Sequence, residues 1–218
     1  MASAPFNPFR KIRVIADILA FFGLRCNRTS YLKQVGWFAS FRRLMPVDAQ
    51  NHAVPWYTYS AIDFLASRLR PDMEVFEYGS GNSTLWWAAR VAKVVSCEHD
   101  QEWFSRMASR MPGNVDYRQA DLEPAGDYAR AILHGGQKFD VVLIDGRNRI
   151  ECAKNAVKAI QANGVIIWDD GERPQYREGY EHLAAHGFRR LDFSGIAPMH
   201  SSGKLTSVFY RERNCLGL

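Results

Sequence analysis

Acidic side chains follow several apolar, β-branched runs of this chain and are the first candidates for chemistry. Glu98 closes the run that starts at Val94. Asp145, Asp169 and Asp170 follow two later runs. Because the carboxyl ends of parallel strands meet at one edge of an open sheet, these acids are expected to converge on one crevice although they lie far apart in sequence. Carboxylates gathered there can accept hydrogen bonds from a sugar, bind a cation or take up a proton.

A glycine-rich loop precedes these acids. The stretch from Val75 to Thr84 has the pattern of a buried strand that turns through Gly79 and Gly81 into a helix. Glycines there let the backbone take positive φ and approach a ligand, and the start of the helix presents unpaired N–H groups. The loop therefore predicts a binding site for a nucleotide-like ligand. Glu77 before the first glycine, and Thr84 in place of a third, argue against the pyrophosphate-binding version of this motif.

The elements that must position these residues alternate as strand and helix. A helix is expected from Leu85 to Val91, between the glycine loop and the run that ends at Glu98. Further strands are expected at Val115 to Gln119, Phe139 to Ile144 and Val165 to Trp168. Strands that alternate with helical segments predict an open, parallel α/β sheet.

This pattern resembles the class I S-adenosylmethionine-dependent methyltransferases over roughly Pro71 to the C-terminus. The resemblance implies a Rossmann-like, doubly wound, mostly parallel seven-stranded α/β sheet whose last strand is antiparallel. Phe188 to Phe193 and Leu205 to Arg211 are placed to form the terminal hairpin. The stretches 76–84 and 206–211 also resemble a group of uncharacterised bacterial methyltransferase-like proteins.

The same resemblance implies S-adenosyl-L-methionine as the cofactor and assigns its contacts. The loop that matches Glu77 to Gly81 wraps the methionine part, the acid that matches Glu98 holds the ribose, and the acid that matches Asp121 lies near adenine. A side chain at the position of His99 often borders adenine, and a solvated loop histidine is the alternative. The implied cofactor residues are Glu77, Gly79, Ser80, Gly81, Ser83, Thr84, Glu98, His99, Asp121 and Asp145.

The segment after the fourth strand restricts the methyl acceptor. Amino-directed nucleic-acid methyltransferases generally carry an Asn/Asp-Pro-Pro-aromatic run there, whereas this chain has Asp145, Gly146 and Arg147. The difference favours O-methylation of a small molecule or saccharide, with no nucleic-acid partner. Arg147 is a candidate to hold an anionic group of the acceptor through its forked guanidinium. Arg149 is a second candidate for such a group, but it opens the next helix and is expected instead to pair with Glu151 or Glu172.

Two mechanisms remain open for the proton of the acceptor. Asp145, Asp169 and Asp170 fall where the catechol-type O-methyltransferases hold a divalent ion, and oxygen ligands suit a metal such as Mg²⁺. That family usually has Asn where this chain has Asp170, for which a loop cap or a pair with Arg173 is the alternative role. In the metal-free mechanism, Asp145 or His200 takes the proton directly.

The first 54 residues differ in character and are expected to form a helical extension before a cofactor-binding domain over residues 55–218. Ile12 to Leu24 is apolar but too short to span a bilayer, and Asp17 interrupts it. Tyr31 to Leu44 mixes aromatic with basic residues. These segments predict either helices that cover the sheet or make a homodimer contact, or a peripheral membrane contact.

Composition agrees with one domain. The chain has 218 residues, of which 47% are hydrophobic, and can bury one substantial core. Its four cysteines lack metal-ligand spacing, which favours a reducing, cytoplasmic compartment. Two rival functions stay open. An aminopropyltransferase uses the same sheet, although Arg147 is unfavourable for a polyamine, and a non-catalytic scaffold or membrane-surface adaptor would retain only the fold.

Overall fold

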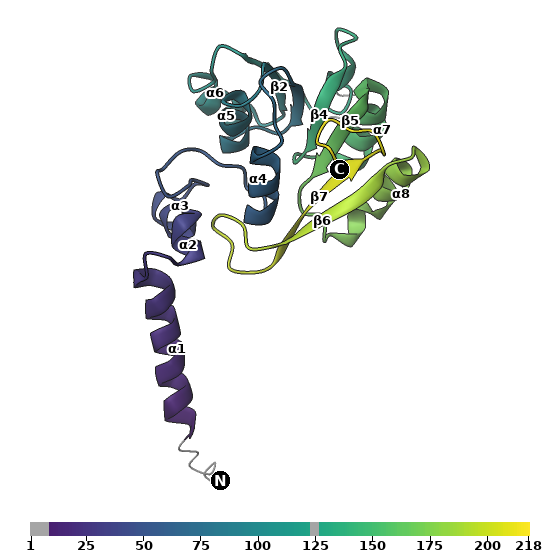
Figure 1. The fold of residues 1–218 in the computed structure, drawn as a ribbon. Coiled ribbons are helices and arrows are strands. Elements are labelled where there is room, and N and C mark those ends of the chain that lie inside the picture. The colour runs from purple at the N-terminus through teal and green to yellow at the C-terminus, as the bar shows by residue number, and fades with distance from the viewer. Residues whose placement is uncertain (1–8, 123–126) are drawn as a thin grey trace, which may run out of the picture.

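The computed structural model describes residues 9–122 and 127–218, which form one seven-stranded sheet with helices on both faces (Figure 1). The strands are β1 (Glu74–Tyr78), β2 (Lys93–Glu98), β3 (Val115–Gln119), β4 (Phe139–Ile144), β5 (Ile160–Trp168), β6 (Arg189–Gly195) and β7 (Lys204–Tyr210). The α-helices are α1 (Phe9–Cys26), α2 (Tyr31–Gln34), α3 (Trp37–Arg43), α4 (Tyr59–Ala66), α5 (Asn82–Ala88), α6 (Gln101–Ala108), α7 (Arg149–Ala159) and α8 (Arg177–Ala185). Two 3₁₀ turns are η1 (Ala131–Leu133) and η2 (Pro174–Tyr176).

The sheet has the strand order β3-β2-β1-β4-β5-β7-β6. Strands β1 to β5 pair in parallel, and β7 is antiparallel to both β5 and β6. The predicted doubly wound sheet with a terminal antiparallel hairpin is therefore confirmed. The strand order reverses between β1 and β4, and ligands bind at such a switch point, beyond the carboxyl ends of the strands.

Both faces of the central strands are buried, which explains their unbroken apolar runs. In β4, Val141 and Leu143 point into a core covered by α4 and α5, whereas Val142 and Ile144 point into a second core covered by α7 and α8. Small residues on the inner side of α7, such as Ala153, let this helix pack closely on the sheet. This packing of helices on both faces of the sheet fixes the position of the last residue of each strand.

Two predicted boundaries are corrected by the structure. Helix α5 spans Asn82–Ala88, so the glycine loop passes directly into the helix, and the helix ends three residues before the predicted Val91. Strand β5 begins at Ile160 and not at Val165. Its first residues include an exposed polar segment and pair with β4 across a register irregularity, so they lack the apolar pattern from which strands are inferred.

The N-terminal extension is helical, as predicted, but the segment from Tyr31 to Leu44 forms two short helices, α2 and α3, separated by a turn at Val35 and Gly36. Helix α1 projects away from the sheet (Figure 1). The extension is attached to the loop between β6 and β7, because the Trp37 indole Nε1 donates to the carbonyl of His200 at 2.7 Å. No helix in the described ranges is long and apolar enough to cross a membrane.

Candidate functional site

The loop between β1 and α5 lies against the loop between β4 and α7. Gly79 takes the left-handed conformation with φ +99°, which few residues other than glycine adopt. Gly81 is extended with φ 162°, so the predicted positive φ holds only at Gly79 of the two. A Cβ added to Gly146 would lie 1.8 Å from the hydroxyl oxygen of Tyr128. The backbone at Gly146 therefore has no room for a side chain.

Glu77 organises the glycine loop from inside. Its carboxylate accepts hydrogen bonds from the hydroxyls of Ser83 at 2.5 Å, Thr84 at 2.5 Å and Ser96 at 3.1 Å. The Thr84 hydroxyl in turn accepts from the backbone N–H of Gly81 at 3.0 Å. Glu77 and Ser83 still reach the lining of a cavity, whereas Thr84 is fully buried behind the loop. The structure thus gives Thr84 a role in shaping the loop.

The burial of Glu77 leads to a prediction about stability. Burial raises the pKa of Glu77 from 4.5 to about 7, although the three hydroxyl donors act in the opposite direction. Between these values the folded protein keeps a proton that the unfolded chain releases, so the free energy of unfolding should fall as pH rises. In Glu77→Gln this slope should decrease by up to about 1.4 kcal/mol per pH unit, and the raised pKa values of Asp145 and Asp169 account for the slope that remains. Urea unfolding across this pH range measures it, and an unchanged slope would contradict the assignment.

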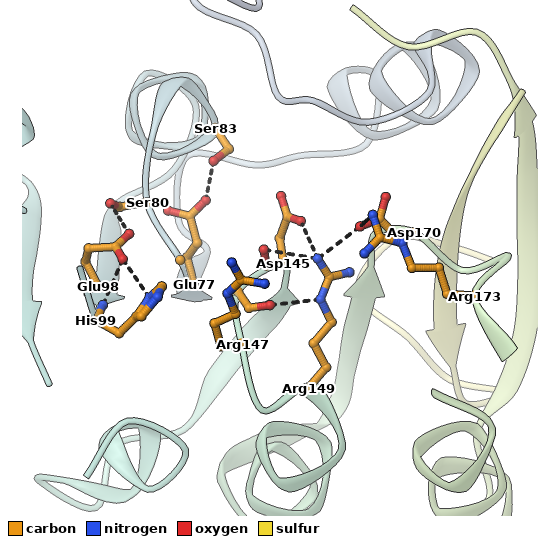
Figure 2. A pocket seen from close by; sticks show the side chains of 12 residues that line it. Glu77, Ser80, Ser83, Glu98, His99, Asp145, Arg147, Arg149, Asp170 and Arg173 are labelled. Carbon is orange, nitrogen blue, oxygen red and sulfur yellow. Dashed lines mark hydrogen bonds and ion pairs between the residues drawn. The ribbon is translucent and has the colours of Figure 1, made fainter. Parts of the chain in front are cut away.

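Glu98 lies at the end of β2 and is held in a fixed orientation. One carboxylate oxygen accepts from the backbone N–H groups of His99 at 2.8 Å and Asp100 at 2.9 Å. The other accepts from the Ser80 hydroxyl at 2.8 Å, and the Tyr117 hydroxyl lies 2.8 Å from the same serine oxygen. Figure 2 shows Glu98, Ser80 and His99 together on one side of the cavity. A preorganised carboxylate in this position suits a ligand with paired hydroxyls.

Asp121 lies apart from this group. Its exposed carboxylate accepts from the Gln119 side chain at 3.1 Å, and it is not among the described residues that line either of the cavities described below. The adenine contact of Asp121 stays a prediction. Trp103 is closer to the glycine loop, since its indole Nε1 donates to the carbonyl of Ser80 at 3.0 Å.

The three aspartates at the ends of β4 and β5 converge as predicted. Asp145, Asp169 and Asp170 each bring a carboxylate oxygen within 4.8 Å of the others. Burial raises the pKa of Asp145, while the neighbouring Arg149 lowers it. Burial also raises the pKa of Asp169, and repulsion from the Asp145 carboxylate raises it further.

Cationic side chains of the chain itself neutralise this cluster. Figure 2 shows the Arg149 guanidinium between two carboxylates, at 3.2 Å from Asp145 and 3.2 Å from Asp170. The prediction that Arg149 pairs with Glu151 or Glu172 is wrong, because α7 begins at this residue and turns its side chain toward the strand ends.

Lys204, the first residue of β7, supplies a second cation. Its side chain is 7% exposed, and its ammonium forms an ion pair with Asp169 and lies 3.3 Å from Asp170. Arg173 pairs with Asp170 from the other side at 2.9 Å, which confirms the alternative role that the sequence left open for Asp170. A divalent ion among these carboxylates would meet the ammonium and the guanidinium at contact distance. The residues present therefore do not fit a metal ion.

Two adjoining cavities open at this edge of the sheet and share Ser80, Ser83 and Asp145. The first has a volume of about 320 Å³ and a mostly polar lining. The second has a volume of about 360 Å³ and a more apolar lining, much of it from the N-terminal extension. The first is lined by Glu77, Gly79, Ser80, Ser83, Glu98, His99, Asp145, Gly146, Arg147, Arg149, Asp170 and Arg173. The second is lined by Leu44, Met45, Pro46, Val54, Trp56, Ser80, Gly81, Asn82, Ser83, Trp103, Arg110, Asp145 and Met199.

The two remaining candidates, Arg147 and His200, are placed differently. Arg147 is exposed and lines the first cavity, and its guanidinium has no ion-pair partner within the described ranges. His200 lies outside the lining of both cavities and packs edge-on against Trp56, with ring centroids 5.7 Å apart. Its neighbour Met199 lines the second cavity instead. The structure thus brings Arg147, but not His200, together with Asp145.

Comparisons with known proteins agree with this geometry. A family model described as a methyltransferase domain matches residues 76–171, a range that includes both loops and the three aspartates. A search of the curated proteins gives no match.

Solved structures with the same fold differ in what their names say they act on. A precorrin-6y C5,15-methyltransferase from Geobacter metallireducens aligns with a TM-score of 0.56 at 14% identity, covering 70% of this chain and 87% of its own. An rRNA methylase from Streptococcus thermophilus aligns with a TM-score of 0.53 at 14% identity, covering 71% and 96%. The O-methyltransferase TomG from Streptomyces achromogenes, solved with S-adenosylmethionine, aligns with a TM-score of 0.55 at 18% identity, covering 89% and 96%.

At these identities the solved structures establish the fold and leave the acceptor open. The sequence match adds that residues 76–171 resemble a methyltransferase domain. The chain therefore has the fold of the class I S-adenosylmethionine-dependent methyltransferases, and the part of it that holds both loops and the three aspartates matches a methyltransferase-domain family model.

Proposed function

We propose that this protein methylates a hydroxyl group of a small molecule or saccharide, with S-adenosylmethionine as the methyl donor and without a metal ion. The observation that carries the proposal is the position of Asp145, which lines both cavities at the point where they meet. A carboxylate there can contact a cofactor in the first cavity and the acceptor hydroxyl in the second.

The polar first cavity fits the cofactor. Its volume of about 320 Å³ is within the range of small-ligand sites, and it presents a rigid carboxylate, Glu98, and the open backbone at Gly79. When bound, S-adenosylmethionine supplies an activated methyl group, so the protein has to align the acceptor and take its proton. Asp145 is the candidate base for that proton, because its raised pKa lies closer to neutrality than that of an exposed carboxylate.

The second cavity fits a flat, partly apolar acceptor. Trp56 and Trp103 line it with aromatic surface that suits an aromatic or sugar ring, and Met45, Val54 and Met199 supply apolar contact. Arg147 in the first cavity and Arg110 in the second are candidates for an anionic substituent of the acceptor. These features support a small acceptor.

Calorimetric titration with S-adenosylhomocysteine, followed by transfer of labelled methyl groups to a panel of hydroxylated acceptors, tests the proposal. We expect micromolar binding that neither Mg²⁺ nor a chelator changes. Loss of binding or of transfer on chelation would exclude the metal-free mechanism. Absence of binding under all conditions would favour a scaffold.

Glu98→Ala tests the cofactor contact directly. The ribose would lose charge-assisted hydrogen bonds, so affinity for S-adenosylhomocysteine should fall by about 1–3 kcal/mol. Asp116→Ala is a matched control, because it removes another strand carboxylate that pairs with Arg118 away from both cavities. Unchanged affinity in Glu98→Ala would remove this residue from the ribose site.

A further inference from the structure

The positive charge of the chain is concentrated in its N-terminal extension. Residues 1–54 contain eight Lys and Arg and two acids, Asp17 and Asp48. Residues 55–218 contain 20 Lys and Arg against 21 Asp and Glu. The net charge of +5 therefore comes from the extension, while the methyltransferase domain is slightly acidic.

Helix α1 also exposes large apolar side chains. Ile15, Ile18, Leu19, Phe21, Phe22 and Leu24 are between 47% and 65% exposed. Four of these, Ile15, Ile18, Leu19 and Phe22, recur at the three- and four-residue spacing that places them on one side of a helix. Figure 1 shows α1 extending from α2 into the surroundings, away from the sheet. An apolar surface of this length on a projecting helix indicates an interaction partner.

The basic residues of the following helices lie next to more exposed apolar residues. On α3, Arg42 and Arg43 follow Phe41 and precede Leu44, and all four are exposed. The guanidinium of Arg25, near the end of α1, packs over the ring of Phe38 with 5.2 Å to its centroid. The described side chains of residues 15–45 thus combine exposed apolar and cationic groups.

We propose that residues 15–45 are a docking surface for an anionic lipid bilayer, with α1 lying in the headgroup region. Anionic headgroups complement the basic side chains, and the acyl boundary accepts the apolar ones. A second copy of this chain would bring an equally cationic extension, which like-charge repulsion opposes. Nucleic acid would leave the apolar face of α1 exposed to water.

Docking would also bring the second cavity close to the bilayer, because Leu44, Met45 and Pro46 at the end of the extension line that cavity. The docking proposal nevertheless stands on charge and exposure alone. It does not depend on the proposed acceptor chemistry.

Sedimentation of the purified full chain with vesicles tests the proposal. We expect sedimentation with vesicles that contain phosphatidylglycerol, little with phosphatidylcholine alone, and release by salt. Leu19→Ser combined with Phe22→Ser should weaken binding at least about tenfold through lost apolar burial. Arg42→Glu combined with Arg43→Glu should weaken binding to the anionic vesicles selectively. Both side-chain pairs are exposed, so circular dichroism should show an unchanged fold.

Arg177→Glu on α8 is the matched control, since its side chain is 82% exposed and lies on the methyltransferase domain. It should bind vesicles as the parent does. No sedimentation, or equal loss in Arg177→Glu and in the Arg42/Arg43 variant, would overturn the proposal. A stable dimer in light scattering that the Leu19/Phe22 substitutions dissociate, together with no vesicle binding, would assign the same surface to a second copy and overturn it as well.

Discussion

Replacing Asp145 with asparagine should lower kcat by a factor of about 10²–10⁴ and leave the affinity for S-adenosylhomocysteine nearly unchanged. Asparagine has the same shape and can still accept a hydrogen bond from the Arg149 guanidinium, which lies 3.2 Å from the carboxylate in the parent. It cannot take up the proton of the acceptor. Methyl-transfer assays and calorimetry on the same preparation separate these two effects, and retained turnover would exclude Asp145 as the base.

The pH dependence of turnover gives an independent check. A general base must be ionised, so kcat should rise with pH through the pKa of Asp145. Burial raises this pKa, so the acid limb of the profile should lie above the range of an ordinary aspartate. In Asp145→Asn that limb should disappear from the residual activity. Asp116→Asn, a carboxylate paired with Arg118 outside the cavities, should keep the parent profile.

Lys204→Ala should destabilise the fold by about 3–5 kcal/mol at neutral pH, because it leaves a buried carboxylate without its cation. The Asp169 side chain is 1% exposed and pairs directly with Lys204. Urea unfolding measures the loss. Lys154→Ala is the matched control, since this lysine pairs with Glu151 and Glu178 at the surface and should contribute less than about 1 kcal/mol. Equal effects would show that the buried pair contributes no more than a surface pair.

The same variant tests whether Lys204 occupies the position that a metal ion would take. Removal of Lys204 frees carboxylate oxygens of Asp169 and Asp170, which are ligands that Mg²⁺ and Mn²⁺ prefer. Either ion should therefore stabilise Lys204→Ala more than the parent. Equal stabilisation of both proteins would mean that Lys204 does not compete with a cation.

The convergence of Glu98, Asp145, Asp169 and Asp170 was predictable because it rests on two local rules. Apolar runs mark buried strands, and parallel strands deliver their last residues to one edge of a sheet. The glycine loop is also predictable from the sequence, because its strand, its glycines and the start of its helix follow one another directly along the chain.

The cations at the site were not predictable in this way. Lys204 belongs to the terminal hairpin, and only the insertion of β7 beside β5 brings it to Asp169. Nothing in its neighbours along the chain marks it as buried. Arg149 looked like an ordinary first-turn residue of a helix, and its partners lie on two other segments. The sequence predicts His200 as an alternative base to Asp145, whereas its side chain packs against Trp56 outside the lining of both cavities.

The hydrogen bond between Trp37 and the His200 carbonyl has a consequence for how such proteins diversify. The Lys204 ammonium also donates to the carbonyl of Trp56 at 2.8 Å, so residues 37–56 and residues 200–204 meet at two points beside the second cavity. Among relatives, substitutions in one of these segments should be accompanied by substitutions in the other. Changing the acceptor preference, in evolution or by engineering, would then require that both segments are exchanged together.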